Sequence, residues 1–183
     1  MPDFDTVLRA RRSIHEYDDH KLDIRDVIEI VNAARFIPMA GNIFNLRFII
    51  ISDAQVKQEM ARVSLEQKFI AQASHVIAVC SHPEKTVRAY GNIGLLYTKQ
   101  QAGAAIENIL LKATSMGIAS CWVGAFPYDE MKRILKIPDN IRATTVVEAL
   151  IPLAYPPKKI KERRAEKPSL KAVLYFERWG QEK

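Results

Sequence analysis

A long stretch with few charges in the middle of the chain most constrains how this protein can fold. The residues from about Tyr97 to Met116 are mainly apolar or small, and Gly117 follows as a typical helix C-cap. The run Ala102–Ile106 is small-sided, so another element can pack closely against the helix backbone. A helix that is apolar on nearly all sides has to be buried among other elements.

Shorter helices and strands are predicted on both sides of this helix. Asp3, Asp23 and Asp53 each precede a helical pattern that an aspartate can cap, and Pro38 ends the second of these helices. A short helix is expected at Asp129–Leu135. The expected strands are Leu46–Ser52, His75–Ser81, Ser120–Phe126 (a strand or a strand-to-turn), Ala143–Ile151 and a further candidate at Ala172–Phe176. The uneven alternation predicts an α+β fold, with a central sheet flanked by helices.

The length of 183 residues fits one domain, 1–183. The net charge is +6, and seven basic residues against two acidic ones between Lys158 and Lys171 account for most of it. After Pro152 the sequence is rich in proline and charge and cannot form much core. Residues 154–183 are therefore expected to form an extended C-terminal arm.

Several functional classes lack their sequence signatures. There is no Walker A motif, and Gly91-Asn-Ile-Gly94 is not a dinucleotide-binding GxGxxG. No serine lies in a GxSxG elbow, and no histidine has metal-ligand spacing, so no metal site and no catalytic side chain are expected. Cys80 and Cys121 are expected to be buried free thiols in a reducing compartment. The absence of a membrane-length apolar run and of a signal-peptide pattern favours a soluble, cytoplasmic protein.

The segment Arg11-Arg12-Ser13 is a candidate anion site. Two adjacent guanidinium groups repel each other, but a dianion between or beside them makes the pair tolerable. Guanidinium forks bind phosphate oxygens in pairs, and a serine hydroxyl supplies a further donor. These residues alone leave open that the segment is simply the solvated end of the first helix.

Four segments, taken in order, resemble the flavin-dependent nitroreductase family over about Val7 to Gly180. The first is similar to the family's N-terminal RRS motif and the second to its P-S-x-x-N loop. The four segments are Arg11–Ile14, Pro38–Asn42, residues 104–111 with 117–126, and Pro152–Pro156 followed by the basic segment and Glu177-Arg178-Trp179.

The resemblance implies a nitroreductase-like fold whose central sheet is mainly antiparallel or mixed. It implies a homodimer with one FMN at each of two interface sites, and a C-terminal arm exchanged between the subunits. It also implies ping-pong chemistry, in which NAD(P)H gives hydride to flavin N5 and the electrons pass to a small acceptor such as a nitroaromatic or a quinone. No nucleic-acid or membrane partner is implied.

The family motifs carry over onto named positions of this chain. The resemblance implies that the N-terminal segment binds the phosphate and ribityl chain, and that the Pro38 loop lies along one face of the flavin ring. A backbone N–H after the long helix would bond N5, and basic residues of the partner's arm would close on the phosphate. The implied FMN-binding residues are Arg11, Arg12, Ser13, His15, Pro38, Met39, Ala40, Asn42, Val123, Gly124, Ala125, Arg164 and Lys167. The alternatives are a plain loop for 38–42, a buried strand for 123–125 and a solvated charge run for the segment with Arg164 and Lys167.

Departures from the family pattern keep other functions open. His15 stands where many members carry Arg or Lys, so flavin potential is expected to vary with pH through this residue and His15→Arg to flatten that profile. Phe44-Asn45-Leu46 replaces the frequent Gln-Pro-Trp, Met39 replaces a small hydroxyl residue, and Ala154 replaces a glycine. One alternative is an FMN-binding protein without turnover, such as a flavin store or redox sensor. Another is a nucleic-acid binder using the basic arm, although it lacks a recognised motif.

Overall fold

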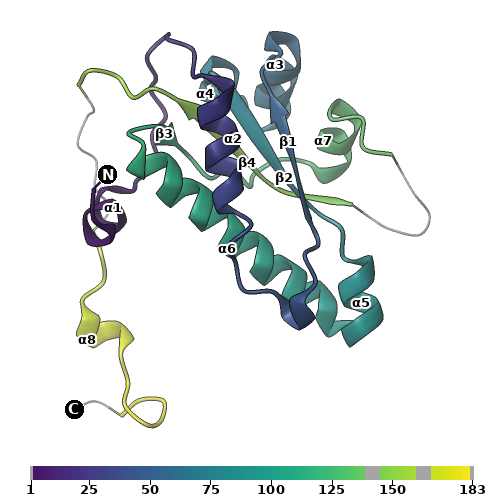
Figure 1. Ribbon diagram of the computed structural model, residues 1–183, viewed down its shortest axis with the longest axis vertical. Coiled ribbons are helices and arrows are strands. Elements are labelled where there is room, and N and C mark those ends of the chain that lie inside the picture. The colour runs from purple at the N-terminus through teal and green to yellow at the C-terminus, as the bar shows by residue number, and fades with distance from the viewer. Residues whose placement is uncertain (1, 139–144, 160–165, 182–183) are drawn as a thin grey trace.

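The computed structural model describes residues 2–138, 145–159 and 166–181. Its centre is a four-stranded sheet in the order β1-β2-β4-β3, with every neighbouring pair antiparallel (Figure 1). The strands are β1 (Leu46–Ile51), β2 (His75–Ser81), β3 (Ala119–Ser120) and β4 (Val146–Ala154). One parallel bridge, between Ser13 and Ser120, extends the sheet beyond β3. The expected α+β class and the mainly antiparallel sheet are therefore confirmed.

The central strand β2 divides the core into two layers. All of its residues are buried, as expected for a short apolar strand covered on both faces. Because successive side chains point to opposite faces, Ile77 and Val79 pack with α2 and α6, whereas Val76 and Ala78 pack with the opposite layer. That second layer contains α3, α4 and α7.

The long helix α6 (Ile93–Ser115) covers one face of the sheet and begins earlier than the sequence predicts. Its N-terminal end packs against α5 (Glu84–Tyr90), which the sequence analysis did not predict. A Cβ on Gly94 would lie 2.5 Å from the carbonyl oxygen of Thr86, so only glycine allows the two helices to approach this closely. At the other end, Gly117 has φ +70° and ends the helix as expected.

The predicted aspartate caps are confirmed at three helices. Asp3, Asp23 and Asp53 accept backbone N–H groups in the first turns of α1 (Phe4–Ala10), α2 (Ile24–Ala33) and α3 (Ala54–Val63). Helix α2 ends before Pro38, so residues 34–39 form an irregular approach to the short 3-10 helix η1 (Ala40–Asn42). Helix α7 (Tyr128–Ile134) matches its prediction closely, and α4 (Lys68–Gln72) was not predicted.

For 120–126 the strand-to-turn alternative fits, whereas the candidate strand at 172–176 is wrong. In 120–126, only Ser120 belongs to a regular strand, because the backbone leaves the sheet edge and returns through a single antiparallel bridge between Val123 and Leu150. Residues 172–176 form no strand: α8 (Leu170–Val173) lies there, capped by Ser169. Figure 1 shows α8 on an arm that stands away from the body of the chain. Strand β4 extends to Ala154, and residues 143–144 lie outside the described part.

Candidate functional site

The segment Arg11–His15 runs along the β3 edge of the sheet. The backbone N–H of Ile14 donates to the carbonyl of Ser120 at 3.1 Å, beside the parallel bridge formed by Ser13. This pairing places the cationic segment next to the chain that continues from β3 towards Gly124. The residues predicted to bind phosphate and those predicted to approach flavin N5 are therefore brought together at one edge.

The two adjacent arginines have different surroundings. Arg11 Nε lies 3.4 Å from Glu107 Oε1 on α6. Arg12 lines a hollow of about 180 Å³ at the C-terminal end of α6, together with Ile14 and Ile118. Its Nη1 is buried and has no hydrogen-bond partner among the described residues. The repulsion between the guanidinium groups is thus relieved by separation, and each keeps donor capacity for an anion.

A histidine–thiol contact lies between this segment and β3. His15 Nε2 is 3.1 Å from Cys121 Sγ, and the imidazole ring packs on Phe69 with centroids 4.5 Å apart. Burial raises the pKa of the Cys121 thiol, while a hydrogen bond from Ser13 and the charge of Arg11 oppose that rise. Cys121 is a neighbour of the predicted site that sequence reasoning treated only as a core thiol.

Tyr17 extends this cluster into the core. Its hydroxyl is buried without a hydrogen-bond partner among the described residues, and burial raises the pKa of its phenol. The charge that Cys121 would carry as a thiolate raises that pKa further. Both groups are therefore neutral at neutral pH, which leaves Arg11 as the charged neighbour of the Cys121 thiol.

The stretch Val123–Ala125 is only partly available to a ligand. Val123 is buried and exchanges two hydrogen bonds of 2.9 Å with Leu150, so its N–H cannot also donate to a flavin. Gly124 and Ala125 are exposed, and their N–H groups have no partner among the described residues. The donor expected to reach flavin N5 is therefore the backbone N–H of Gly124 or of Ala125. Val123 instead holds this stretch against Leu150 of β4.

The predicted ring-face loop, Pro38–Asn42, lies beside the N-terminal half of α6. Pro38, Met39 and Ala40 line a hollow of about 330 Å³ with residues 97–104 of that helix. Arg11, by contrast, contacts Glu107, about 9 Å further along the helix from Gln101 at 1.5 Å per residue. This hollow includes none of Arg11–His15, and the hollow beside Arg12 includes none of Pro38–Asn42.

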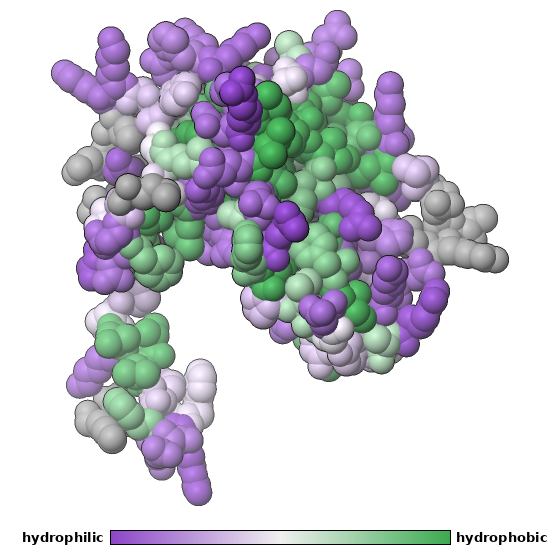
Figure 2. Space-filling view, in the orientation of Figure 1, coloured by the Kyte–Doolittle hydropathy of each residue, from purple (hydrophilic) through white to green (hydrophobic). Residues whose placement is uncertain are grey.

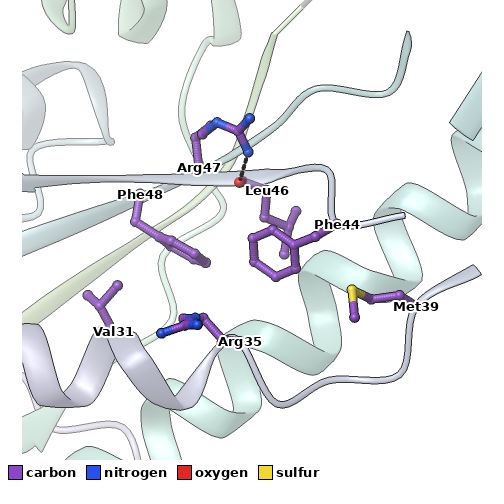
Figure 3. Close-up of a pocket in the computed structure, with 7 residues that line it drawn as sticks. All are labelled: Val31, Arg35, Met39, Phe44, Leu46, Arg47 and Phe48. Carbon is purple, nitrogen blue, oxygen red and sulfur yellow. Dashed lines mark hydrogen bonds between the residues drawn. The ribbon is translucent and has the colours of Figure 1, made fainter. Parts of the chain in front are cut away.

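A second hollow next to this loop was not predicted. It measures about 450 Å³ and lies between α2 and β1 (Figure 3). Figure 3 shows Phe44 and Phe48 facing it, with Arg35 from the turn after α2 and Arg47 from β1 nearby. The altered residues Phe44 and Leu46 therefore contribute to this wall, whereas Asn45 is buried in a separate polar cluster.

The arm residues predicted to reach the phosphate are not placed at the site. Lys167 is exposed on the arm, and Arg164 lies outside the described residues. In the described part of the chain no cluster of His, Cys, Asp or Glu could hold a metal ion, and no helix there could cross a membrane. The positively charged groups of the site in a single chain are therefore Arg11 and Arg12.

Solved structures define the class of fold. A crystal structure of a nitroreductase family protein from Clostridium novyi NT superposes with a TM-score of 0.75 and 26% identity, covering 98% of this chain and 96% of that chain. An NADPH:FMN oxidoreductase from Vibrio harveyi, complexed with NAD+, gives a TM-score of 0.83 at 16% identity over 98% of this chain and 79% of that one. The architecture is the nitroreductase fold.

Sequence comparison identifies the family. The model of the nitroreductase family matches residues 8–85 and 62–155. A protein of Archaeoglobus fulgidus, provisionally named NADH dehydrogenase/NAD(P)H nitroreductase, is 33% identical over 154 residues, which is 82% of this chain and 83% of that protein. FMN reductase (NADPH) of Bacillus subtilis is 22% identical over 75% of this chain and 60% of its own length. This chain belongs to the nitroreductase family.

Proposed function

We propose that this chain is an FMN-dependent oxidoreductase that takes hydride from NAD(P)H and reduces a small acceptor such as a nitroaromatic or a quinone. Family membership and the names of the relatives support the enzyme class and both cofactors. Within the molecule, the Ser13–Ser120 bridge carries the proposal. It holds the segment with two arginines along the stretch that continues from β3 to the open N–H groups of Gly124 and Ala125, and a cofactor with a phosphate and a flat ring needs both kinds of group.

Bound FMN would supply the redox chemistry, accepting hydride at N5 and passing electrons on in a ping-pong cycle. The protein's part is binding and orientation. Arg11 and Ser13 would hold the phosphate or ribityl chain, and Arg12, which lines its own hollow, would add a further positive charge to that side of the site. The N–H of Gly124 or Ala125 would face the flavin ring, while Val123 fixes that stretch against β4.

A second copy of the chain completes the site. Because the loop bonds to Gln101, about 9 Å along α6 from the Glu107 that Arg11 contacts, we assign Pro38–Asn42 to the FMN bound mainly by the other subunit. The arm supports a dimer, since Leu170, Val173 and Trp179 are exposed on a segment apart from the body (Figures 1 and 2). Lys167 and Arg164 are the arm residues assigned to the partner's phosphate.

The test is the visible spectrum of the purified protein, followed by release and identification of its chromophore. We expect FMN at close to one per chain, and NADH or NADPH oxidation that depends on an added quinone or nitroaromatic. Bound FMN without turnover would instead establish the flavin store or sensor. A colourless protein that takes up no added FMN would overturn the proposal.

A further inference from the structure

A buried polar cluster lies beneath the Pro38–Asn42 loop. It consists of Asn45, Thr86, Thr98 and Gln101, each no more than 4% exposed. Asn45 Nδ2 donates to the hydroxyl oxygens of Thr86 and Thr98, both at 2.8 Å. The Thr98 hydroxyl donates in turn to the carbonyl of Gly94 at 2.9 Å. This Asn45 cluster therefore joins the start of β1 to both α5 and α6.

Gln101 connects the Asn45 cluster to the loop. In the amide orientation that satisfies every neighbour, its Nε2 donates to Asn45 Oδ1 and to the carbonyl of Ile43, each at 3.2 Å. Its Oε1 accepts the backbone N–H of Ala40, also at 3.2 Å. One side chain thus holds both ends of the turn from Ala40 to Ile43, and it comes from the buried face of α6.

The turn needs such support because its backbone is strained. Gly41 and Asn42 both have left-handed geometry, with φ of +57° and +55°. Asn42 has a Cβ and adopts this region only at a cost. Within the turn itself, the backbone supplies two hydrogen bonds, Asn42 N–H to Met39 at 3.2 Å and Ile43 N–H to Ala40 at 3.1 Å. Strain of this kind persists where surrounding structure over-determines it.

We infer that Gln101 is a positioning residue that holds the Ala40–Ile43 turn in its left-handed form and thereby presents Asn42 to the flavin. The inference rests on the proposed function, because it assigns the turn to the FMN site. A turn that is already in the binding geometry keeps the apparent dissociation constant for FMN low. If a smaller fraction of the molecules has the turn in that geometry, the apparent dissociation constant rises in inverse proportion to that fraction.

A purely structural role for Gln101 predicts a different result. In that case its loss would lower the stability of the whole chain and leave the affinity of the folded protein for FMN unchanged. The affinity of folded apoprotein, measured well below its melting temperature, therefore separates the two roles. Exchange of the Ala40 amide hydrogen reports on the turn itself, independently of any ligand.

The test compares Gln101→Met with Ser115→Ala. Methionine keeps the length of Gln101 and removes its three hydrogen bonds. Ser115 lies on the same helix, and its hydroxyl donates to the carbonyl of Lys112 at 2.8 Å, so its loss does not touch the turn. With FMN titrated into apoprotein and followed by quenching of flavin fluorescence, we expect Gln101→Met to raise the dissociation constant about tenfold and Ser115→Ala about twofold or less.

The outcomes are distinct. Equal dissociation constants for both variants and the wild type would overturn the inference and leave the proposed function standing. A wild-type chain that takes up no FMN would overturn the proposed function and the flavin part of the inference together. Exchange of the Ala40 amide should be about tenfold faster in Gln101→Met than in Ser115→Ala; an unchanged rate would show that Gln101 does not hold the turn.

Discussion

The two ends of helix α6 support their loops in different ways. Near the C-terminal end, the Arg11–His15 segment is held through its backbone, by the pairing with Ser120, and its charged side chains remain partly open to solvent. Near the N-terminal end, the Ala40–Ile43 turn is held by buried side chains. The first arrangement leaves charges free for an anion, and the second fixes a strained backbone. Substitutions at the two ends should therefore fail in different ways.

The largest effect is expected from Asn45→Ala. This change removes the acceptor and donors that satisfy Thr86, Thr98 and Gln101 in a buried place, so the free energy of unfolding should fall by about 3 kcal/mol. Chemical denaturation measures it. Asn32→Ala is the control, since Asn32 is exposed and bonds only Arg35, and its effect should stay within about 0.5 kcal/mol. A loss below about 1 kcal/mol for Asn45→Ala would show that the cluster contributes little.

The next effect is expected from Gly41→Ala. The alanine would have to adopt a left-handed backbone conformation, and its Cβ would lie 2.4 Å from Tyr90 Oη. The free energy of unfolding should therefore fall by about 2 kcal/mol. Gly117→Ala is the matched control, because it has φ +70° and open space around it, and about 1 kcal/mol is expected there. Denaturation of both variants isolates the Tyr90 contact. Equal losses would mean that the flexible tyrosine moves away without cost.

At the charged end, paired substitutions should act on FMN affinity in opposite directions. Arg11→Gln should weaken FMN binding about tenfold, since a charge-assisted bond to phosphate is lost. Glu107→Gln should strengthen it about twofold, because the carboxylate at 3.4 Å competes for Arg11. Calorimetric titration at low and high salt measures both effects, which should shrink as salt screens the charges. If Glu107→Gln weakened binding, the carboxylate would be orienting Arg11 and not competing with the phosphate.

A smaller effect than that of Arg11→Gln is expected from alkaline pH. Burial raises the pKa of Cys121 above the ordinary thiol value of 9.0, so the thiol is neutral at neutral pH and gains charge only above its ordinary range. FMN affinity should then fall about threefold as the thiolate forms beside Arg11. The thiol's contribution to stability is complete below the ordinary pKa and is lost as pH rises through the folded value. Cys121→Ser should remove this part of the pH dependence, and an identical profile in the variant would exclude Cys121 as its origin.

Local patterns predicted much of the fold. The aspartate caps, the buried strand β2 and the long helix follow from rules that act within a few residues. The 172–176 strand failed because β-branched and aromatic residues do not form a strand without a neighbour to pair with, and Ser169 offers a helix cap instead. Helix α4, with only 5 residues, is too short for periodicity to detect.

The site was less predictable, because its contacts are long-range. The resemblance supplied its residues, but only coordinates show that Val123 has no free N–H or that Arg12 turns away from Arg11. The sequence did contain one unused signal for the Asn45 cluster. Thr98 and Gln101 are uncharged polar residues at buried positions of α6, and buried polar groups of that kind usually have partners.

The pairing of β2 has a consequence for the order in which the chain can fold. His75 pairs with Leu153 and Ser81 with Val146, so this fully buried strand waits for a partner made much later in synthesis. Until β4 leaves the ribosome, one edge of β2 stays open, although β1 can already pair with the other. A nascent chain in this state exposes an aggregation-prone strand. Translation pauses before residue 146 should therefore lower the yield of folded protein more than pauses after 154.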